Sequence, residues 1–246
     1  MSDSLKNRII EALINQKEIF GDELLEEVNI KLEKLQASQA EKKTNIPINN
    51  IDDWENSRTL EQLESLINIC QKCSLAKNRN NFVFGSGNPK ADVMIIGEGP
   101  GAEEDKQGLP FVGRAGKLLT DILKAIHFTR DEVFIANVVK CRPPSNRTPL
   151  PLEMDTCIPY LKKQIEIIKP KLILCLGKTA AVGILKMNSS LGNMRGKFFD
   201  FESGSRRTKV MVTYHPAALL RNPNWKKPAW EDVQKFRALY DELKEK

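Results

Sequence analysis

Four short apolar runs constrain the fold of this chain more than any other feature. They are DVMIIGE (92–98), EVFIANVVK (132–140), KLILCLG (171–177) and KVMVTYH (209–215). The first two intervals between them carry a clear helical pattern, AGKLLTDILKAI and LEMDTCIPYLKKQIEII, whereas the third interval is less clear. Strands that alternate with helices predict an α/β fold with a parallel sheet covered on both faces.

Ligands of such sheets bind outside the carboxyl ends of the strands. Three conspicuous segments fall at those ends: GEGPG (97–101) after the first run, Asn137 late in the second, and HPAALLRNP (215–223) after the fourth. The chain order therefore predicts a site assembled from segments that lie far apart in the sequence.

The segment GEGPGAEEDKQGLPFVGRAG (97–116) narrows the kind of ligand. Its six glycines and two prolines are typical of a loop that lets a ligand approach the backbone closely. The same loop carries four carboxylates, which would repel a bare phosphate. The loop therefore favours a ligand that needs close backbone contact and neighbouring carboxylates together.

The charge is divided unevenly along the chain. Residues 1–56 carry seven Lys or Arg against twelve Asp or Glu, whereas the other 190 residues carry 31 against 20. A basic body favours a polyanionic partner, with nucleic acid the leading candidate. A soluble surface that is merely rich in lysine explains the same charge, so charge alone does not decide the partner.

The N-terminal segment differs in character from the body. From residue 3 to about residue 35, apolar residues recur at helical spacing, which predicts two amphipathic pieces broken near Gly21. The polar stretch 36–56 is typical of a linker, and a helix is predicted from Thr59 to Cys70 with Thr59 or Ser57 as its cap. We therefore predict an acidic helical extension with its linker (1–56) and a body (57–246).

The composition is that of a soluble globular chain, with 41% hydrophobic and 28% charged residues. No stretch approaches the roughly 18 consecutive apolar residues of a membrane span. The N-terminus also lacks the continuous apolar core of a secretory signal. We therefore expect a cytoplasmic protein that does not bind membranes.

Four of the five cysteines indicate a metal centre. Cys70 and Cys73 form a C-x-x-C, and Cys141 and Cys157 follow far along the chain, whereas Cys175 lies inside an apolar run and is expected to be a buried core thiol. A disulfide framework is not expected in a cytoplasmic chain. The spacing suits either tetrahedral zinc or a cluster of iron and sulfide and does not separate them. Four unrelated free cysteines are the simpler alternative.

Five ordered motifs give the body a resemblance to a known family. They are C-x-x-C (70–73), VFGSGNPKADVMIIGEGPGAEEDKQGLPFVGRAGKLL (83–119), NVVKCRPPSNRTP (137–149), MRGK (194–197) and YHPAALLRNP (214–223). Across residues 57–240 the chain resembles the iron–sulfur enzymes of family four of the uracil-DNA glycosylase superfamily. Residues 1–56 fall outside the resemblance.

The resemblance implies a three-layer α/β/α fold with a four-stranded parallel sheet. It also implies a [4Fe–4S] cluster on Cys70, Cys73, Cys141 and Cys157, which would pin together loops that face DNA. The implied activity is that of a monofunctional DNA glycosylase, which excises uracil from single- or double-stranded DNA by hydrolysing the N-glycosidic bond in base excision repair. The acidic, amphipathic extension 1–56 lies outside the resemblance. Its character would suit docking to a replication or repair protein, or covering the basic face until DNA arrives, and an inert tail is the alternative.

The resemblance also assigns the residues that would bind a flipped-out uracil. Gly99 would let backbone N–H groups approach the base, and Phe111 would stack on its face. Asn137 offers both an amide donor and a carbonyl acceptor, which complement O4 and N3–H of uracil but not cytosine. A core phenylalanine and an asparagine that merely caps a strand end are the structural alternatives.

The chemistry needs a donor at uracil O2 and a polar group near the sugar. The resemblance assigns the donor role to His215. In the best-known branch of the superfamily an aspartate positions the water, but Gly99 stands in that slot here. We therefore expect Glu104, with Glu98 second, to orient the water or stabilise the oxocarbenium ion. Because Gly101 replaces a tyrosine of that branch, we also expect Glu104 to exclude the methyl group of thymine.

The segment HPAALLRNP is the expected DNA-side element. Leu219, Leu220 and Arg221 are predicted to enter the base stack as the uracil leaves it. The alternative is an ordinary helix start after His-Pro.

Three other functions remain open. A non-catalytic iron–sulfur DNA-binding module of a replication or repair assembly would share the fold and cluster, although binding alone needs neither Asn137 nor His215. A zinc-dependent hydrolase is disfavoured because four thiolates leave zinc no open position for water. A glycosylase for a broader range of deaminated bases is the nearest alternative, and the acidic GEGPGAEED favours the narrower uracil enzyme.

Overall fold

A computed structural model describes residues 51–203 and 206–245. The helical extension and most of the linker predicted for residues 1–56 lie outside these described residues. The compact unit begins at Ile51 with η1 (Ile51–Asn56), before the boundary predicted at residue 57. Trp54 belongs to this unit because its ring packs edge-on against Tyr160, with the ring centroids 4.8 Å apart.

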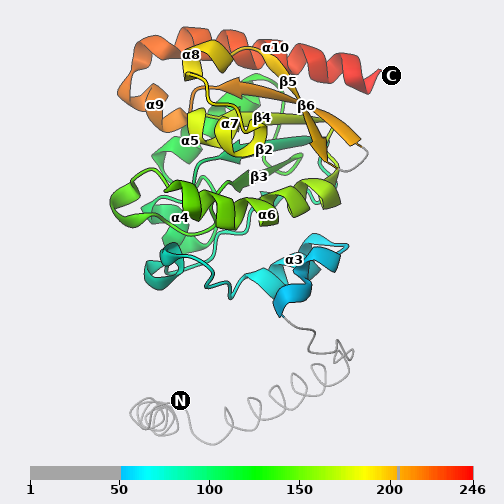
Figure 1. Cartoon of the computed structure of the whole chain (residues 1–246). Helices are drawn as coiled ribbons and strands as arrows, with labels where there is room; N and C mark the ends of the chain where they lie inside the picture. Colours follow the sequence, from blue (N-terminus) through cyan, green and yellow to red (C-terminus); the bar gives the residue numbers. More distant parts are fainter. Residues whose placement is uncertain (1–50, 204–205, 246) are drawn as a thin grey trace, which may run out of the picture. The chain divides into compact units, whose positions relative to one another are not determined.

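The sheet has six strands in the order β1-β3-β2-β4-β6-β5 (Figure 1). Its four central strands are parallel to one another: β3 (Val133–Asn137), β2 (Val93–Gly97), β4 (Leu172–Leu176) and β6 (Arg206–Thr213). They coincide with the four apolar runs of the sequence, which confirms the predicted α/β fold.

Two antiparallel strands, which the sequence did not predict, extend the sheet at its edges. β1 (Ser86–Gly87) pairs with β3, and β5 (Phe198–Ser203) pairs with β6. β1 has only two residues, and Phe201 is the only buried residue of β5. An edge strand that is covered on one face needs no continuous apolar run, so neither strand stands out in the sequence.

Helices cover both faces of the sheet, as a three-layer fold requires. One face packs against α6 (Pro151–Ile168) and α7 (Lys178–Leu185), and the other packs against α5 (Arg114–Ala125) and α10 (Lys226–Lys244). α3 (Leu60–Ile67) packs against α6. Figure 1 shows α6 and α7 in front of the strands. Successive side chains of a strand point to opposite faces. In β2, Met94 and Ile96 therefore face the first layer, and Val93 and Ile95 face the second.

Shorter elements connect these layers and form the loops around the carboxyl ends of the strands. They are η2 (Ser74–Asn78), α4 (Ala102–Gln107), η3 (Pro144–Asn146), α8 (Leu191–Met194), α9 (Pro216–Arg221) and η4 (Pro223–Trp225). The start of α3 agrees with the sequence, since Thr59 Oγ1 accepts a hydrogen bond from Gln62 N at 3.2 Å and so caps the helix. None of the helices in the described ranges is long and apolar enough to cross a membrane.

Candidate functional site

A cavity of about 440 Å³ opens at the carboxyl ends of the parallel strands. The strand register pairs Gly97 at the end of β2 with Asn137 at the end of β3, while His215 lies two residues after the end of β6. The cavity brings together the residues that the sequence analysis assigned to the base and to the chemistry: Glu98, Gly99, Glu104, Phe111, Asn137 and His215. The predicted assembly of a site from distant segments is therefore observed.

Asn137 is buried in the wall of this cavity with an exposed fraction of 2%. Its Oδ1 atom is buried and accepts no hydrogen bond from the described part of the chain. A buried acceptor without a donor costs about 1–3 kcal/mol, so native proteins rarely keep one without a use. A Cβ atom on Gly97 would collide with this oxygen and with the Phe111 ring, which explains the first glycine of the loop.

Phe111 forms a second wall in an unusual backbone conformation. Its φ angle is 54°, in the left-handed region that few residues other than glycine adopt. Arg130 holds this turn by donating to the carbonyl oxygens of Phe111 and Pro110 at 3.2 and 2.8 Å. A Cβ atom on Gly116 would overlap the Phe111 carbonyl, so a glycine is required there. Backbone strain of this kind is typical of functional sites. In this conformation the centroid of the Phe111 ring lies 5.5 Å from the centroid of the His215 ring.

His215 caps the N-terminus of α9, and this role sets its tautomer. Its Nδ1 atom accepts a hydrogen bond from Ala217 N at 3.1 Å, so the proton of the neutral imidazole resides on Nε2. Burial lowers the pKa of His215 to about 4, and the charge of Arg221 acts in the same direction. At neutral pH the cavity therefore contains an uncharged imidazole with one N–H available as a donor.

The Glu104 carboxylate is engaged by the loop that surrounds it. Its Oε1 atom accepts from Val112 N and Gly113 N at 2.9 and 3.0 Å, and its Oε2 atom accepts from Gly101 N at 3.1 Å. This carboxylate ties the start of α4 to the residues that follow Phe111. It also fills the space beside Gly101, where an added Cβ atom would lie 2.7 Å from Oε2.

The Glu98 carboxylate has more freedom to bind a ligand. Its Oε2 atom accepts a hydrogen bond from Thr179 Oγ1 of α7 at 2.5 Å, and its Oε1 atom accepts none from residues that the structure describes. The sequence analysis missed Thr179. Its position just after the apolar run 171–177 was the only available signal.

Gly99 lines the cavity, but its lack of a side chain also has a packing reason. A Cβ atom there would lie 2.7 Å from Val139 Cγ2. Leu219 is only 2% exposed, so its side chain is not available to enter the DNA stack as the sequence predicted. In contrast, Leu220 is 44% exposed and Arg221 lines the cavity.

Cys70, Cys73, Cys141 and Cys157 gather beside this site. Arg79 donates both to the Cys70 carbonyl oxygen at 2.6 Å and to Cys141 Sγ at 3.2 Å. Burial raises the pKa of the Cys141 thiol, and the charges of Cys73 and Cys70 raise it further. Burial likewise raises the pKa of Cys157 to about 12, with added contributions from Cys141 and Cys73. Cys70, Cys73 and Cys141 are therefore each close enough to another of these thiols to raise its pKa.

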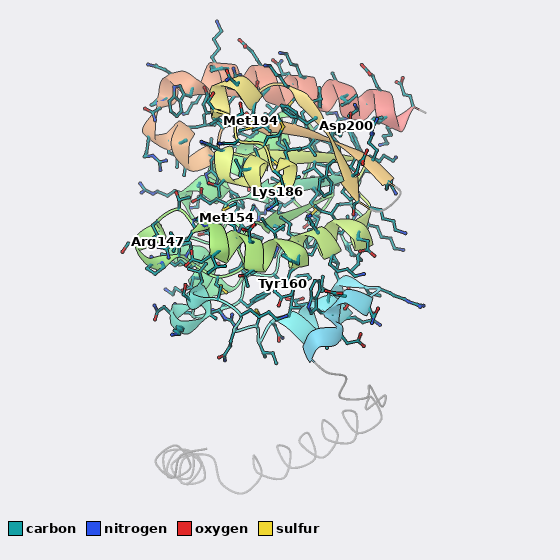
Figure 2. The ribbon with its side chains drawn as sticks, in the orientation of Figure 1. Arg147, Met154, Tyr160, Lys186, Met194 and Asp200 are labelled. Carbon is teal, nitrogen blue, oxygen red and sulfur yellow. The ribbon has the colours of Figure 1, made fainter. Side chains whose placement is uncertain are left out.

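Two further contacts surround these cysteines. Tyr160 donates to Cys70 Sγ at 3.3 Å, and Figure 2 shows Tyr160 between α6 and the segment that contains α3. Lys140 is fully buried, its Nζ atom donates to Gln164 Oε1 at 2.6 Å, and burial lowers its pKa to about 8. Within the described ranges, no three His, Cys, Asp or Glu side chains are placed to hold one metal ion. Cys175 is fully buried, as expected of a core thiol.

A partly buried ion pair connects the cysteine region with the cavity wall. Arg147, which lines the cavity, donates to both carboxylate oxygens of Glu153 at 2.8 Å. Ser74, next to Cys73, donates to the same carboxylate at 2.8 Å. These hydrogen bonds lower the pKa of Glu153 to about 2, and the bond from Arg147 has the largest effect. The sequence analysis missed both Glu153 and Ser74, because residues 74 and 153 meet only in the folded chain.

Sequence comparison matches this chain to known proteins. The family model of the uracil DNA glycosylase superfamily matches residues 84–234. A type-4 uracil-DNA glycosylase of Sulfurisphaera tokodaii is 48% identical over 186 residues, which are 74% of this chain and 84% of that protein. A type-4 uracil-DNA glycosylase of Archaeoglobus fulgidus is 42% identical over 185 residues, covering 74% and 93%. One of Pyrobaculum aerophilum is 45% identical over 181 residues, covering 72% and 92%.

Proposed function

We propose that this chain, which belongs to the type-4 family of the uracil-DNA glycosylase superfamily, is a monofunctional glycosylase that excises uracil from DNA. The observation that carries the proposal is the buried Oδ1 atom of Asn137, which accepts no hydrogen bond within the described chain. Uracil supplies the missing donor with N3–H, and the Asn137 amide N–H can donate to O4 of the same base. Cytosine has an acceptor at N3, so it would leave the buried oxygen without a donor.

Phe111 and His215 then contact different parts of the bound base, its face and its O2 atom. The Phe111 ring stacks on the pyrimidine, and His215 Nε2–H donates to O2. As the N-glycosidic bond breaks, its electron pair moves into the base and negative charge develops on O2, while the sugar becomes an oxocarbenium ion. A neutral donor that is already in place stabilises this charge without reorganisation.

Glu98 is the carboxylate best suited to the sugar and the water. Thr179 occupies one of its oxygens and leaves Oε1 for a water molecule that adds to the anomeric carbon. Glu104 acts as a positioning residue, because three backbone N–H groups already occupy its carboxylate. Its place beside Gly101 suits it to exclude the methyl group of thymine.

The four gathered cysteines fit an anionic iron–sulfur cluster. Lys140 is fully buried and its ammonium group has no carboxylate partner within the described residues, so the region lacks the negative charge that a buried cation requires. A cluster held by four thiolates would supply that charge. When bound, the cluster would contribute negative charge and tie the loop at 70–74 to α6. Cys70, Cys73, Cys141 and Cys157 would hold it.

The cluster predicts a specific optical signature. The purified chain should be brown with absorbance at about 400 nm, and Cys157→Ser should lose most of this absorbance because one iron loses its thiolate. Cys175→Ser is the matched control, since Cys175 is a fully buried residue of β4 outside the proposed ligand set, and it should keep the absorbance. A colourless wild-type protein that contains stoichiometric zinc would refute the cluster.

The activity itself is tested by release of uracil without strand cleavage. The protein is incubated with a uracil-containing oligonucleotide and then treated with alkali, which breaks the strand at abasic sites. Breakage only after alkali is expected of a monofunctional glycosylase. Parallel oligonucleotides that contain hypoxanthine test the broader range of bases. No breakage by a protein that still binds the oligonucleotide would favour the DNA-binding module instead.

The lowered pKa of His215 predicts an unusual pH dependence. Because the imidazole stays neutral down to about pH 4, single-turnover uracil release should show no inflection at the ordinary histidine pKa of about 6.5. The unfolded chain binds this proton before the folded chain does. His215 therefore lowers the stability of the fold as the pH falls from about 6.5 toward 4. An acidic limb near about pH 6.5 that vanishes in His215→Gln would contradict the neutral donor.

A further inference from the structure

The segment that joins α9 to α10 forms an exposed basic surface with one large aromatic ring. All residues from Leu220 to Lys227 are exposed, and among them are Arg221, Trp225, Lys226 and Lys227 but no acidic residue. The Trp225 side chain is 40% exposed. Positive charge around an exposed ring is the composition of surfaces that bind single-stranded nucleic acid.

The Trp225 ring is fixed in place although it is exposed. It stacks on Tyr214 with the ring centroids 4.9 Å apart and an angle of 18° between the planes. The Arg195 guanidinium also lies over Tyr214, 5.3 Å from the ring centroid. Arg195 is in turn held by Asp232, which is 1% exposed, through hydrogen bonds of 2.6 and 3.0 Å. A partly buried ion pair therefore holds the guanidinium that contacts Tyr214.

This aromatic pair is joined to the base-binding cavity by short connections. Tyr214 immediately precedes His215, and Arg221, which lines the cavity, is followed within four residues by Trp225. Trp225 N donates to the Asn222 carbonyl oxygen at 3.0 Å, which folds η4 back onto the end of α9. A nucleotide next to the flipped base is therefore within reach of this ring.

We propose that Trp225 is a stacking platform for an unpaired base of single-stranded DNA beside the excised uracil. The proposal rests on the proposed function. Tyr214 stacks on the indole, and Trp225 keeps an exposed fraction of 40% for contact with a nucleobase, while Arg221, Lys226 and Lys227 meet the phosphates. The bases of a duplex are already stacked on one another, so the platform distinguishes single-stranded from double-stranded DNA.

The chain offers a matched control for this proposal. Trp230 is also 40% exposed and also lies near the start of α10. It has no ring contact with the described residues, and acidic Glu231 follows it. Trp225→Ala and Trp230→Ala therefore remove equally exposed rings from two different settings.

The test measures binding of a uracil-free single-stranded oligonucleotide, which requires no chemistry. Trp225→Ala should weaken binding about 5- to 100-fold, the range for loss of one base–aromatic stack. Trp225→Phe should retain most of the affinity but lose the quenching of tryptophan fluorescence that DNA causes in the wild type. Trp230→Ala should change neither the affinity nor the quenching. The affinity for a duplex of the same sequence should change little in any of the three variants.

The outcomes separate this proposal from the proposed function. Equal binding by Trp225→Ala and wild type, with uracil release intact, would overturn the platform alone. Equal losses for single-stranded and duplex DNA would also overturn it, because a general loss of contact has no preference for unpaired bases. Weakened single-strand binding by Trp225→Ala in a protein that never releases uracil would support the platform and overturn the glycosylase.

Discussion

Replacement of His215 with leucine should lower the rate of uracil release about 100- to 1,000-fold, the usual effect of removing one donor to a developing oxyanion. Leucine retains most of the bulk of the imidazole but has no N–H for uracil O2. The loss should fall on kcat, with KM nearly unchanged, because the negative charge on O2 develops only as the bond breaks. Single-turnover kinetics with a uracil-containing oligonucleotide measure this difference directly.

Two variants make the result specific to the donor. His215→Gln should recover part of the rate, because its amide N–H can still donate to the base. His127→Asn alters the other histidine, which is exposed and has a φ angle of 58° that asparagine tolerates, and it should leave the rate unchanged. Because His215 Nδ1 also caps α9, the melting temperature of each variant is measured as well. A His215→Leu protein that folds and excises uracil at the wild-type rate would exclude the proposed mechanism.

Replacement of Asn137 with alanine should lower kcat/KM for uracil by at least about 100-fold, since sites built around hydrogen bonds to a substrate depend strongly on them. The same change should have little effect on stability, because the buried Oδ1 atom contributes no hydrogen bond to the described part of the fold. Kinetics and thermal unfolding of the same preparation provide both quantities.

Measured together, kcat/KM and thermal stability distinguish base recognition by Asn137 from a purely structural role of this residue. If Asn137 merely capped the end of β3, the alanine variant would lose stability, and its activity would fall only as far as unfolding requires. Val139→Ala provides a comparison, since Val139 is fully buried next to Gly99. That variant should lose stability through the cavity it creates, while it keeps the groups that contact the base. Full activity in a stable Asn137→Ala protein would contradict the recognition of uracil by this residue.

The two carboxylates of the site show what the sequence predicted and what it did not. The carboxylates of GEGPGAEED are visible in the sequence, but the sequence analysis preferred Glu104 over Glu98 for the water. In the folded chain, N–H groups of residues 101, 112 and 113 converge on Glu104, whereas Thr179 reaches only one oxygen of Glu98. Which carboxylate remains available thus depends on groups that lie 3 to 81 residues away along the chain.

The sequence by itself determined the central strands and the order of the segments at their carboxyl ends. Apolar periodicity reports the local geometry of a strand or helix, and connection rules for parallel strands then bring Asn137 and His215 to one edge of the sheet. Only the tertiary structure decided that Leu219 is buried while Leu220 is exposed, that β5 extends the sheet, and that Trp225 stacks on Tyr214. These features depend on contacts between segments that are distant in the sequence. Such contacts produce no periodic pattern in the sequence of either segment.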